Sequence, residues 1–109
     1  MIFTQAKPLE RDIQRAILQY LKLRKIFAWR NQTTGIYDQK RKTFRANQTM
    51  KGVPDILGIL PGGRFLGIEV KRPGGKLSPE QEQFKIDAIG TGAFYVKATC
   101  IEDLKAAGL

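Results

Sequence analysis

Two apolar runs joined by a short turn-forming segment constrain the fold of this chain more than any other feature. The runs are Asp55–Leu60 and Arg64–Lys71, and Pro61-Gly62-Gly63 lies between them. Paired glycines between β-prone runs favour a tight turn, so the two runs are predicted to form an antiparallel hairpin. If the loop has three residues, Leu60 pairs with Arg64, and every other pair follows by counting along the two strands.

This register decides how three ionisable side chains lie. With a three-residue loop, Asp55 is opposite Glu69, and opposed side chains share a face with Cβ atoms about 5 Å apart. A two-residue turn instead places Asp55 opposite Val70, on the wrong face, unless a bulge intervenes. Glu69 and Lys71 are two residues apart in one strand, so they share a face. A carboxylate in an apolar strand is costly to bury unless a partner or a metal compensates it.

The pattern around the hairpin predicts further helices and strands. In chain order we expect an amphipathic helix, a short strand, a mostly exposed polar segment with one short strand, the hairpin, a second helix capped by Ser78, a final strand and a terminal helix. The first helix is expected at 8–21, the short strand at 26–31, and the polar segment at 32–51 with its strand at 43–45. The second helix is expected at 78–90, the final strand at 93–98 and the terminal helix at 101–107. This order predicts an α/β fold with a mixed sheet flanked by helices, and 109 residues suit one domain.

Charge and ligand content limit the partners of the chain. Nineteen Lys and Arg against ten Asp and Glu give a net charge of +9, which favours nucleic acid as the partner. With no histidine and one cysteine, Cys100, a zinc site lacks ligands, so any metal is expected to be Mg²⁺ or Mn²⁺ held by oxygen. The apolar run Ile56–Leu60 is too short to span a membrane, the first residues lack a signal-peptide pattern, and one cysteine suits the cytoplasm.

These residue types suit phosphodiester hydrolysis. The reaction needs a metal ion that activates water and offsets the charge growing on the phosphate. Asp55 and Glu69 would hold the ion, and Lys71 would position or deprotonate the water or balance the phosphate charge. The pattern alone is weak, because an exposed strand that carries Glu69 and Lys71 as a surface ion pair needs no function.

Three segments carry a family resemblance. They are Gly52-Val53-Pro54-Asp55-Ile56, Gly67-Ile68-Glu69-Val70-Lys71-Arg72-Pro73-Gly74-Gly75-Lys76 and Leu77-Ser78-Pro79-Glu80-Gln81. Together they resemble the VRR-NUC domain of the PD-(D/E)xK nuclease superfamily, in particular its small stand-alone phage and bacterial members. Trp29-Arg30-Asn31 and Gly35 resemble the upstream part of the family pattern. The resemblance covers about residues 8 to 105, so 1–109 is read as a single VRR-NUC-like nuclease domain.

The resemblance implies more than the residues alone do. It implies a restriction-endonuclease-like αβββαβ core, dependence on Mg²⁺ or Mn²⁺, and cleavage of branched DNA, Holliday junctions in particular. It places the protein in the cytoplasm of a bacterial or phage-infected cell. Because these junctions have two-fold symmetry, it also implies a homodimer that presents two active sites.

The family pattern assigns roles to several residues. Asp55 and Glu69 match the metal-binding carboxylates, the backbone carbonyl of Val70 matches the usual third ligand, and Lys71 matches the catalytic lysine. Glu10 matches a glutamate of the first helix, with a possible contact to the metal through water. Its position near a helix N-terminus is also favoured by the helix dipole alone.

Gln81 resembles the glutamine on the helix that follows the lysine strand. It also fits a capping box with Ser78, a role that needs no active site. Where related nucleases place a tyrosine four residues further on, this chain has Lys85, so the roles of the longer motif do not transfer.

Seven basic residues are candidates for phosphate contact, although surface cations are usually just solvated. They are Arg41, Lys42, Arg45, Lys51, Arg64, Arg72 and Lys76. Trp29, Phe84 and Tyr95 are predicted to be core residues rather than base-stacking platforms. Two other functions stay open, a non-catalytic nucleic-acid-binding module that retains the nuclease fold and a restriction-type duplex endonuclease. The sequence leaves the choice between DNA and RNA, and the number of metal ions, undecided.

Overall fold

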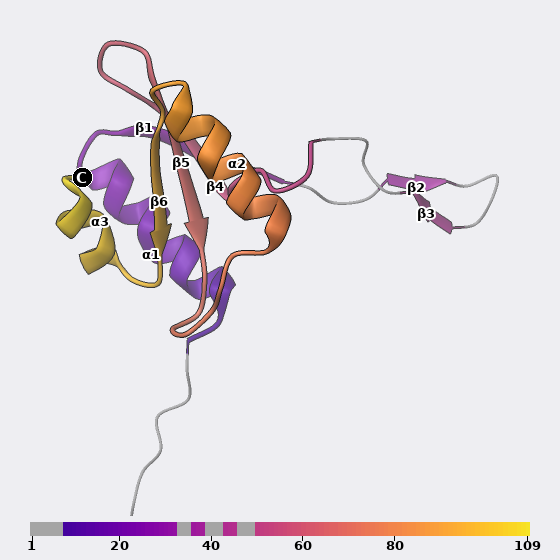
Figure 1. Cartoon of the computed structure of the whole chain (residues 1–109). Helices are drawn as coiled ribbons and strands as arrows, with labels where there is room; N and C mark the ends of the chain where they lie inside the picture. The colour runs from indigo at the N-terminus through magenta and orange to yellow at the C-terminus, as the bar shows by residue number, and fades with distance from the viewer. Residues whose placement is uncertain (1–7, 33–35, 39–42, 46–49) are drawn as a thin grey trace, which may run out of the picture.

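The computed structural model describes residues 8–32, 36–38, 43–45 and 50–109 (Figure 1). Its helices and strands confirm the predicted mixed α/β class and follow the predicted order, with one extra strand. In chain order they are α1 Glu10–Leu23, β1 Phe27–Arg30, β2 Ile36–Asp38, β3 Thr43–Arg45, β4 Ile56–Leu60, β5 Arg64–Val70, α2 Pro79–Gly90, β6 Phe94–Ala98 and α3 Ile101–Ala107.

The extra strand is β2, which lies in the segment predicted to be mostly loop. It pairs with β3 in an antiparallel, two-stranded sheet, with Ile36 opposite Arg45. The sequence predicted only a strand near 43–45, because three residues carry too little periodicity to reveal a strand. A single short strand leaves its backbone groups unpaired, and pairing with β2 satisfies them. Arg41 and Lys42 lie outside the described residues.

The main sheet has the strand order β1-β4-β5-β6. β1, β4 and β5 are antiparallel neighbours, and β6 is parallel to β5, so the chain needs a crossover, which contains α2. The β4–β5 loop has three residues, as the first of the two predicted registers requires. Leu60 pairs with Arg64, and the Gly63 N–H donates to the Leu60 carbonyl at 3.0 Å.

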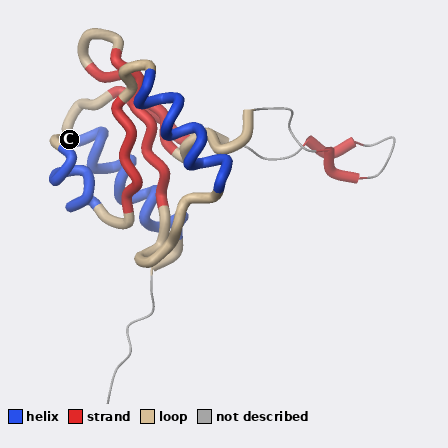
Figure 2. The backbone as a smooth tube through the Cα atoms, viewed as in Figure 1, coloured by secondary structure: helices blue, strands red, loops and turns tan. Residues whose placement is uncertain are grey.

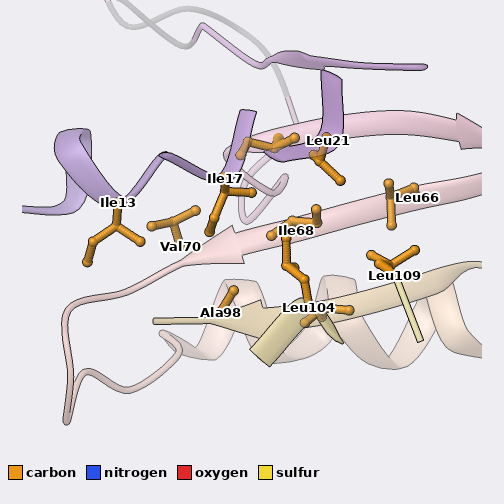
Figure 3. Close-up of a cluster of buried hydrophobic side chains, with 11 residues drawn as sticks. Ile13, Ile17, Leu21, Leu66, Ile68, Val70, Ala98, Leu104 and Leu109 are labelled. Carbon is orange, nitrogen blue, oxygen red and sulfur yellow. The ribbon is translucent and has the colours of Figure 1, made fainter. Parts of the chain in front are cut away.

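One face of this sheet carries the hydrophobic core. Ile13, Ile17 and Leu21 recur every four residues on α1, so they form one stripe that is buried against the sheet. Leu104 of α3 joins the same cluster (Figure 3). The sheet contributes Ile56, Leu66, Ile68, Val70, Val96 and Ala98. Fully burying an aliphatic side chain contributes about 1.5–3 kcal/mol, so this face supplies most of the stabilisation.

Helix α2 covers the β5 and β6 side of the opposite face, so strand β5 is enclosed between helices (Figures 1 and 2). From Leu66 to Val70 every residue of β5 is buried, which agrees with a strand covered on both sides. Ser78 begins α2 with a capping box. Its hydroxyl accepts from the Gln81 N–H at 3.2 Å, and the Gln81 Oε1 accepts from the Ser78 N–H at 2.8 Å. Among the described residues, no helix is long and apolar enough to cross a membrane.

Candidate active site

Asp55 and Glu69 come together as the three-residue loop predicts. Ile56 pairs with Ile68, so the next position places Asp55 opposite Glu69 on the α2 face. The Asp55 Oδ2 accepts from the Val70 N–H at 2.9 Å. The Asp55 carbonyl accepts from the Asn31 N–H at 2.8 Å. Asp55 is therefore held both by β5 and by the residue that follows β1.

Glu69 is a charged residue in the protein interior, with only 2% of its surface exposed. Its Oε1 accepts from the Gln81 Nε2 at 3.0 Å, whereas its Oε2 has no hydrogen-bond partner among the residues that the structure describes. Burial is the largest cause of the rise in the pKa of Glu69 to about 8, and the negative charge of Asp55 is the next largest. The positive charge of Lys71 lowers this pKa by a smaller amount. Without a cation, the ionised form of this carboxyl group is therefore strongly disfavoured.

The arrangement fits a hard divalent cation. Two carboxylates on adjacent strands repel each other, and an ion between them converts that repulsion into coordination. The unpartnered Oε2 of Glu69 is the atom that a cation would satisfy. No group of three or more His, Cys, Asp or Glu side chains that could hold a metal occurs within the described ranges. Two carboxylates, a carbonyl and several waters suit Mg²⁺ or Mn²⁺, because Mg²⁺ usually keeps part of its hydration shell.

Lys71 and Glu10 lie within electrostatic reach of this pair. Lys71 directly follows β5, and its N–H donates to the Ala98 carbonyl at 3.0 Å. Its charge lowers the pKa of Glu69, whereas the charge of Glu10, which is exposed at the start of α1, raises it. The Arg72 Nε donates to the Pro8 carbonyl at 3.1 Å and so ties the start of α1 to the loop beside the site.

Gln81 makes the predicted capping contact and also contacts Glu69. Its amide oxygen caps α2 through the Ser78 N–H, and its amide nitrogen donates to Glu69. Because one side chain makes both contacts, the start of α2 and the orientation of the Glu69 carboxylate are linked. The two sequence interpretations are therefore compatible.

Two glycines allow the backbone to approach closely around Asp55, a feature that the sequence analysis missed. Gly52 has φ +79°, and a Cβ there would lie 2.2 Å from the Glu80 carbonyl oxygen and 2.9 Å from the Gln81 N. A Cβ on Gly67 would lie 3.0 Å from the Pro54 Cγ. The segment before Asp55 therefore packs directly on α2 and β5. A glycine inside a strand, as at Gly67, was the available signal, since it often marks a close backbone approach.

Tyr95 is a second residue that sequence reasoning did not connect with the site. It is opposite Gly67 in the β5–β6 register, on the same face as Glu69. Its ring is half-buried, but its buried hydroxyl has no partner within the described part of the chain. Burial, followed by the charge of Glu69, raises the pKa of Tyr95. Phe84 is also half-buried, whereas the core prediction for Trp29 is wrong, because 41% of its surface is exposed.

The candidate phosphate-binding residues do not all gather at the site. Arg64 begins β5, at the end far from Glu69, where its Nε donates to the Gly92 carbonyl at 2.8 Å and its guanidinium lies 5.1 Å from the centre of the Phe94 ring. Lys51 and Lys76 are exposed. Arg45 lies in β3, and its side chain is outside the description. Contacts of these residues with phosphate therefore stay predictions.

An antiparallel hairpin with an aspartate opposite a Glu-x-Lys strand, followed by a crossover helix and a parallel strand, is the architecture of the PD-(D/E)xK nuclease superfamily. Within that superfamily, the chain belongs to the VRR-NUC family, because the VRR-NUC domain model matches residues 9–98. Membership implies a nuclease-type function and hence DNA binding. No curated protein and no solved structure gives a significant match to the chain.

Proposed function

We propose that this protein is a Mg²⁺- or Mn²⁺-dependent, structure-selective endonuclease that hydrolyses phosphodiester bonds in branched DNA, such as Holliday junctions. The observation that carries the proposal is the buried Glu69 carboxylate, with one unpartnered oxygen, opposite Asp55 and beside Lys71. The net charge of +9 suits a polyanionic substrate.

Each residue of the site has a defined task in this proposal. Asp55, Glu69 and the Val70 carbonyl hold the ion, which when bound lowers the pKa of water and offsets charge on the phosphate. Gln81 keeps the Glu69 carboxylate in one orientation through its 3.0 Å hydrogen bond. Lys71 positions or deprotonates the attacking water or balances the phosphate charge, and Glu10 acts through water.

The raised pKa of Glu69 adds a constraint on this mechanism. Because the pKa is about 8, the carboxyl group is largely protonated near neutral pH in the metal-free protein. A ligand must be deprotonated, so binding of the ion releases this proton and becomes tighter as the pH rises towards 8. Lys71, whose charge already lowers the pKa of Glu69, favours the ionised form of this ligand.

The proposal extends to the assembly and its surroundings. Residues 1–109 would act as one domain, and two copies would form a homodimer whose symmetry matches that of a four-way junction. Arg72 and Lys76, which follow Lys71 in the chain, would contact phosphates close to the cleavage point. The protein would act in the cytoplasm of a bacterial or phage-infected cell.

The test is cleavage of synthetic four-way junctions, flaps and plain duplex in Mg²⁺ or Mn²⁺. Loss of an outer partner of a metal ligand costs 10- to 100-fold, so loss of the ligand itself in Glu69→Gln should reduce cleavage by about 100-fold or more. Glu102→Gln is the matched control, because Glu102 is exposed on α3 at the opposite face of the sheet. Equal cleavage by wild type and Glu69→Gln would reject the proposed site.

The same assay separates the two alternatives. Tight binding of junctions without cleavage, and without binding of Mg²⁺ or Mn²⁺ by calorimetry, would indicate a non-catalytic module. Sequence-dependent cleavage of plain duplex would indicate a restriction-type enzyme.

A further inference from the structure

On the sheet face that carries Glu69, the side towards β1 is not covered by any helix of the described residues. Helix α2 contacts β5 and β6 on this face, through the Gln81–Glu69 hydrogen bond and the Phe84–Phe65 ring contact. Beyond it, towards β1, four large apolar side chains are exposed. They are Phe27 at 66%, Ile59 at 43%, Trp29 at 41% and Phe65 at 37%. We call this set the aromatic platform.

The platform is a continuous feature of three strands. Phe27 is opposite Ile59, and Ile59 is opposite Phe65, so these three side chains form one row across β1, β4 and β5. Trp29 lies two residues along β1 from Phe27, with the two ring centroids 5.2 Å apart. Four exposed apolar side chains gathered in this way point to a binding surface.

The platform leads directly to the carboxylate pair. Asn31, whose N–H is bonded to the Asp55 carbonyl, is two residues beyond Trp29 and four beyond Phe27. At about 3.3 Å per residue, the two rings lie roughly 7 Å and 13 Å along the strand from the level of Asp55. Stacked nucleotides of one strand are about 3.4 Å apart, so these distances correspond to about two and four nucleotides.

Positive charge borders the far end of the platform. Lys22, Arg24 and Lys25 are exposed immediately before β1. Lys22 and Lys25 line a surface hollow of about 460 Å³ between α1 and β1, which adjoins the platform at Phe27 and is also lined by Leu18, Ile26 and Ala28. Aromatic rings beside a basic groove are the combination by which proteins bind single-stranded nucleic acid without reading its sequence. Two copies packed through the platform would bring these same cations close together, whereas a polyanion complements them.

We infer that the aromatic platform stacks unpaired bases of the DNA, a few nucleotides from the bond at Asp55 and Glu69. This inference rests on the proposed nuclease function and narrows its substrate to DNA with an unpaired segment next to the cleavage point. Stacking places the strand along β1, and the cations near Phe27 bind its phosphates.

The chain has its own reporter for this contact, because Trp29 is its only tryptophan. The experiment follows Trp29 emission while a thymidine oligonucleotide or a fully paired, blunt-ended duplex is added in EDTA, so that no cleavage occurs. The oligonucleotide should quench the emission in a saturable manner, because stacked bases quench tryptophan, and the duplex should quench it much less. Anisotropy of labelled DNA measures binding independently.

Two substitutions and one control define the contact. Phe27→Leu keeps the reporter and should weaken oligonucleotide binding about 5- to 150-fold, the range expected for the loss of one stacked base, while binding of the blunt-ended duplex stays the same. Trp29→Phe should remove the signal and keep the affinity within a few-fold. Leu23→Ala is the control, since Leu23 is 77% exposed on α1, away from the platform, and should change neither.

Two results would overturn the inference. One is saturable binding by anisotropy with unchanged Trp29 emission. The other is Trp29 emission that changes with protein concentration and not with added DNA, together with a molecular mass by light scattering that is lower for Phe27→Leu than for the wild type. That result would make the platform an interface between two copies of the chain. The measurement needs no cleavage, so the two proposals can fail separately. Quenching by a protein that cuts no DNA would reject the nuclease proposal and retain the platform. Cleavage without quenching would reject the platform and retain the nuclease proposal.

Discussion

Replacing Glu69 with glutamine should stabilise the metal-free protein near pH 8 although it removes a metal ligand. The carboxyl group is 2% exposed and faces Asp55, so its ionised form is unfavourable in the folded chain. A glutamine of the same shape carries no charge, and its amide can donate to Asp55 instead of repelling it. The expected gain in the free energy of unfolding therefore depends on pH.

The sign follows from proton binding in the two states. In the folded protein the pKa of Glu69 is about 8, against an ordinary value of 4.5, so between these values the folded state binds more protons than the unfolded state. The stability of the wild type therefore falls as the pH rises through this window. At about 1.4 kcal/mol per pKa unit, the loss reaches about 3–5 kcal/mol. Each kcal/mol moves the Tm of a domain of this size by about 4–8 °C.

The assay is thermal unfolding followed by circular dichroism in EDTA at steps from pH 5 to pH 8.5. Glu69→Gln and wild type should have similar Tm values at pH 5, and the variant should be at least about 10 °C more stable at pH 8. Mn²⁺ should raise the Tm of the wild type and leave that of the variant nearly unchanged. Parallel Tm curves for the two proteins across the whole pH range would refute the idea of an uncompensated buried carboxylate. Glu102→Gln controls for the loss of an exposed carboxylate.

Three further predictions follow from the packing. Gly52→Ala should lower kcat/KM at least about 10-fold, because the new Cβ would displace the start of α2 and Gln81. Gly62→Ala is the control and should leave kcat/KM unchanged, because Gly62 has a similar φ of +86° but no atom near its Cβ. Tyr95→Phe removes a buried hydroxyl that has no partner among the described residues. The free energy of unfolding, measured by urea titration in EDTA, should therefore stay the same or rise by about 1 kcal/mol. A loss of more than about 1 kcal/mol would contradict this expectation. Ile17→Ala should cost about 2–5 kcal/mol in the same titrations and retain cleavage at low temperature, since Ile17 is fully buried on the face opposite the site.

The sequence was sufficient to predict the part of the site that depends on local rules. Side chains in a strand alternate between faces, so a three-residue loop after Leu60 was enough to place Asp55 opposite Glu69. The capping pattern likewise predicted the start of α2 at Ser78. The sequence also indicated a capping role and a site role for Gln81, although not that one amide contacts Ser78 and Glu69 together.

Contacts between distant segments were beyond the reach of the pattern. Nothing around Gly52 indicates that the backbone of α2 passes 2.2 Å from where its Cβ would be, because that depends on how α2 packs on the sheet. The position of α2 also decides that the Tyr95 hydroxyl is buried and Trp29 is exposed, although both are aromatic residues of short strands. An apolar residue in a strand predicts a side of the sheet, but not whether that side is covered.

The two faces of the sheet differ in their contribution to stability, and this difference explains how the chain accommodates a buried glutamate. Ile17, Ile56 and Ile68 are completely buried on one face, and burial of each contributes about 1.5–3 kcal/mol. On the other face, Glu69 imposes a cost of about 3–5 kcal/mol near pH 8. A bound cation would remove that cost, so ion binding and folding would be coupled through one carboxyl group. For this reason, cleavage by variants of the apolar face has to be compared at temperatures where each variant is equally folded.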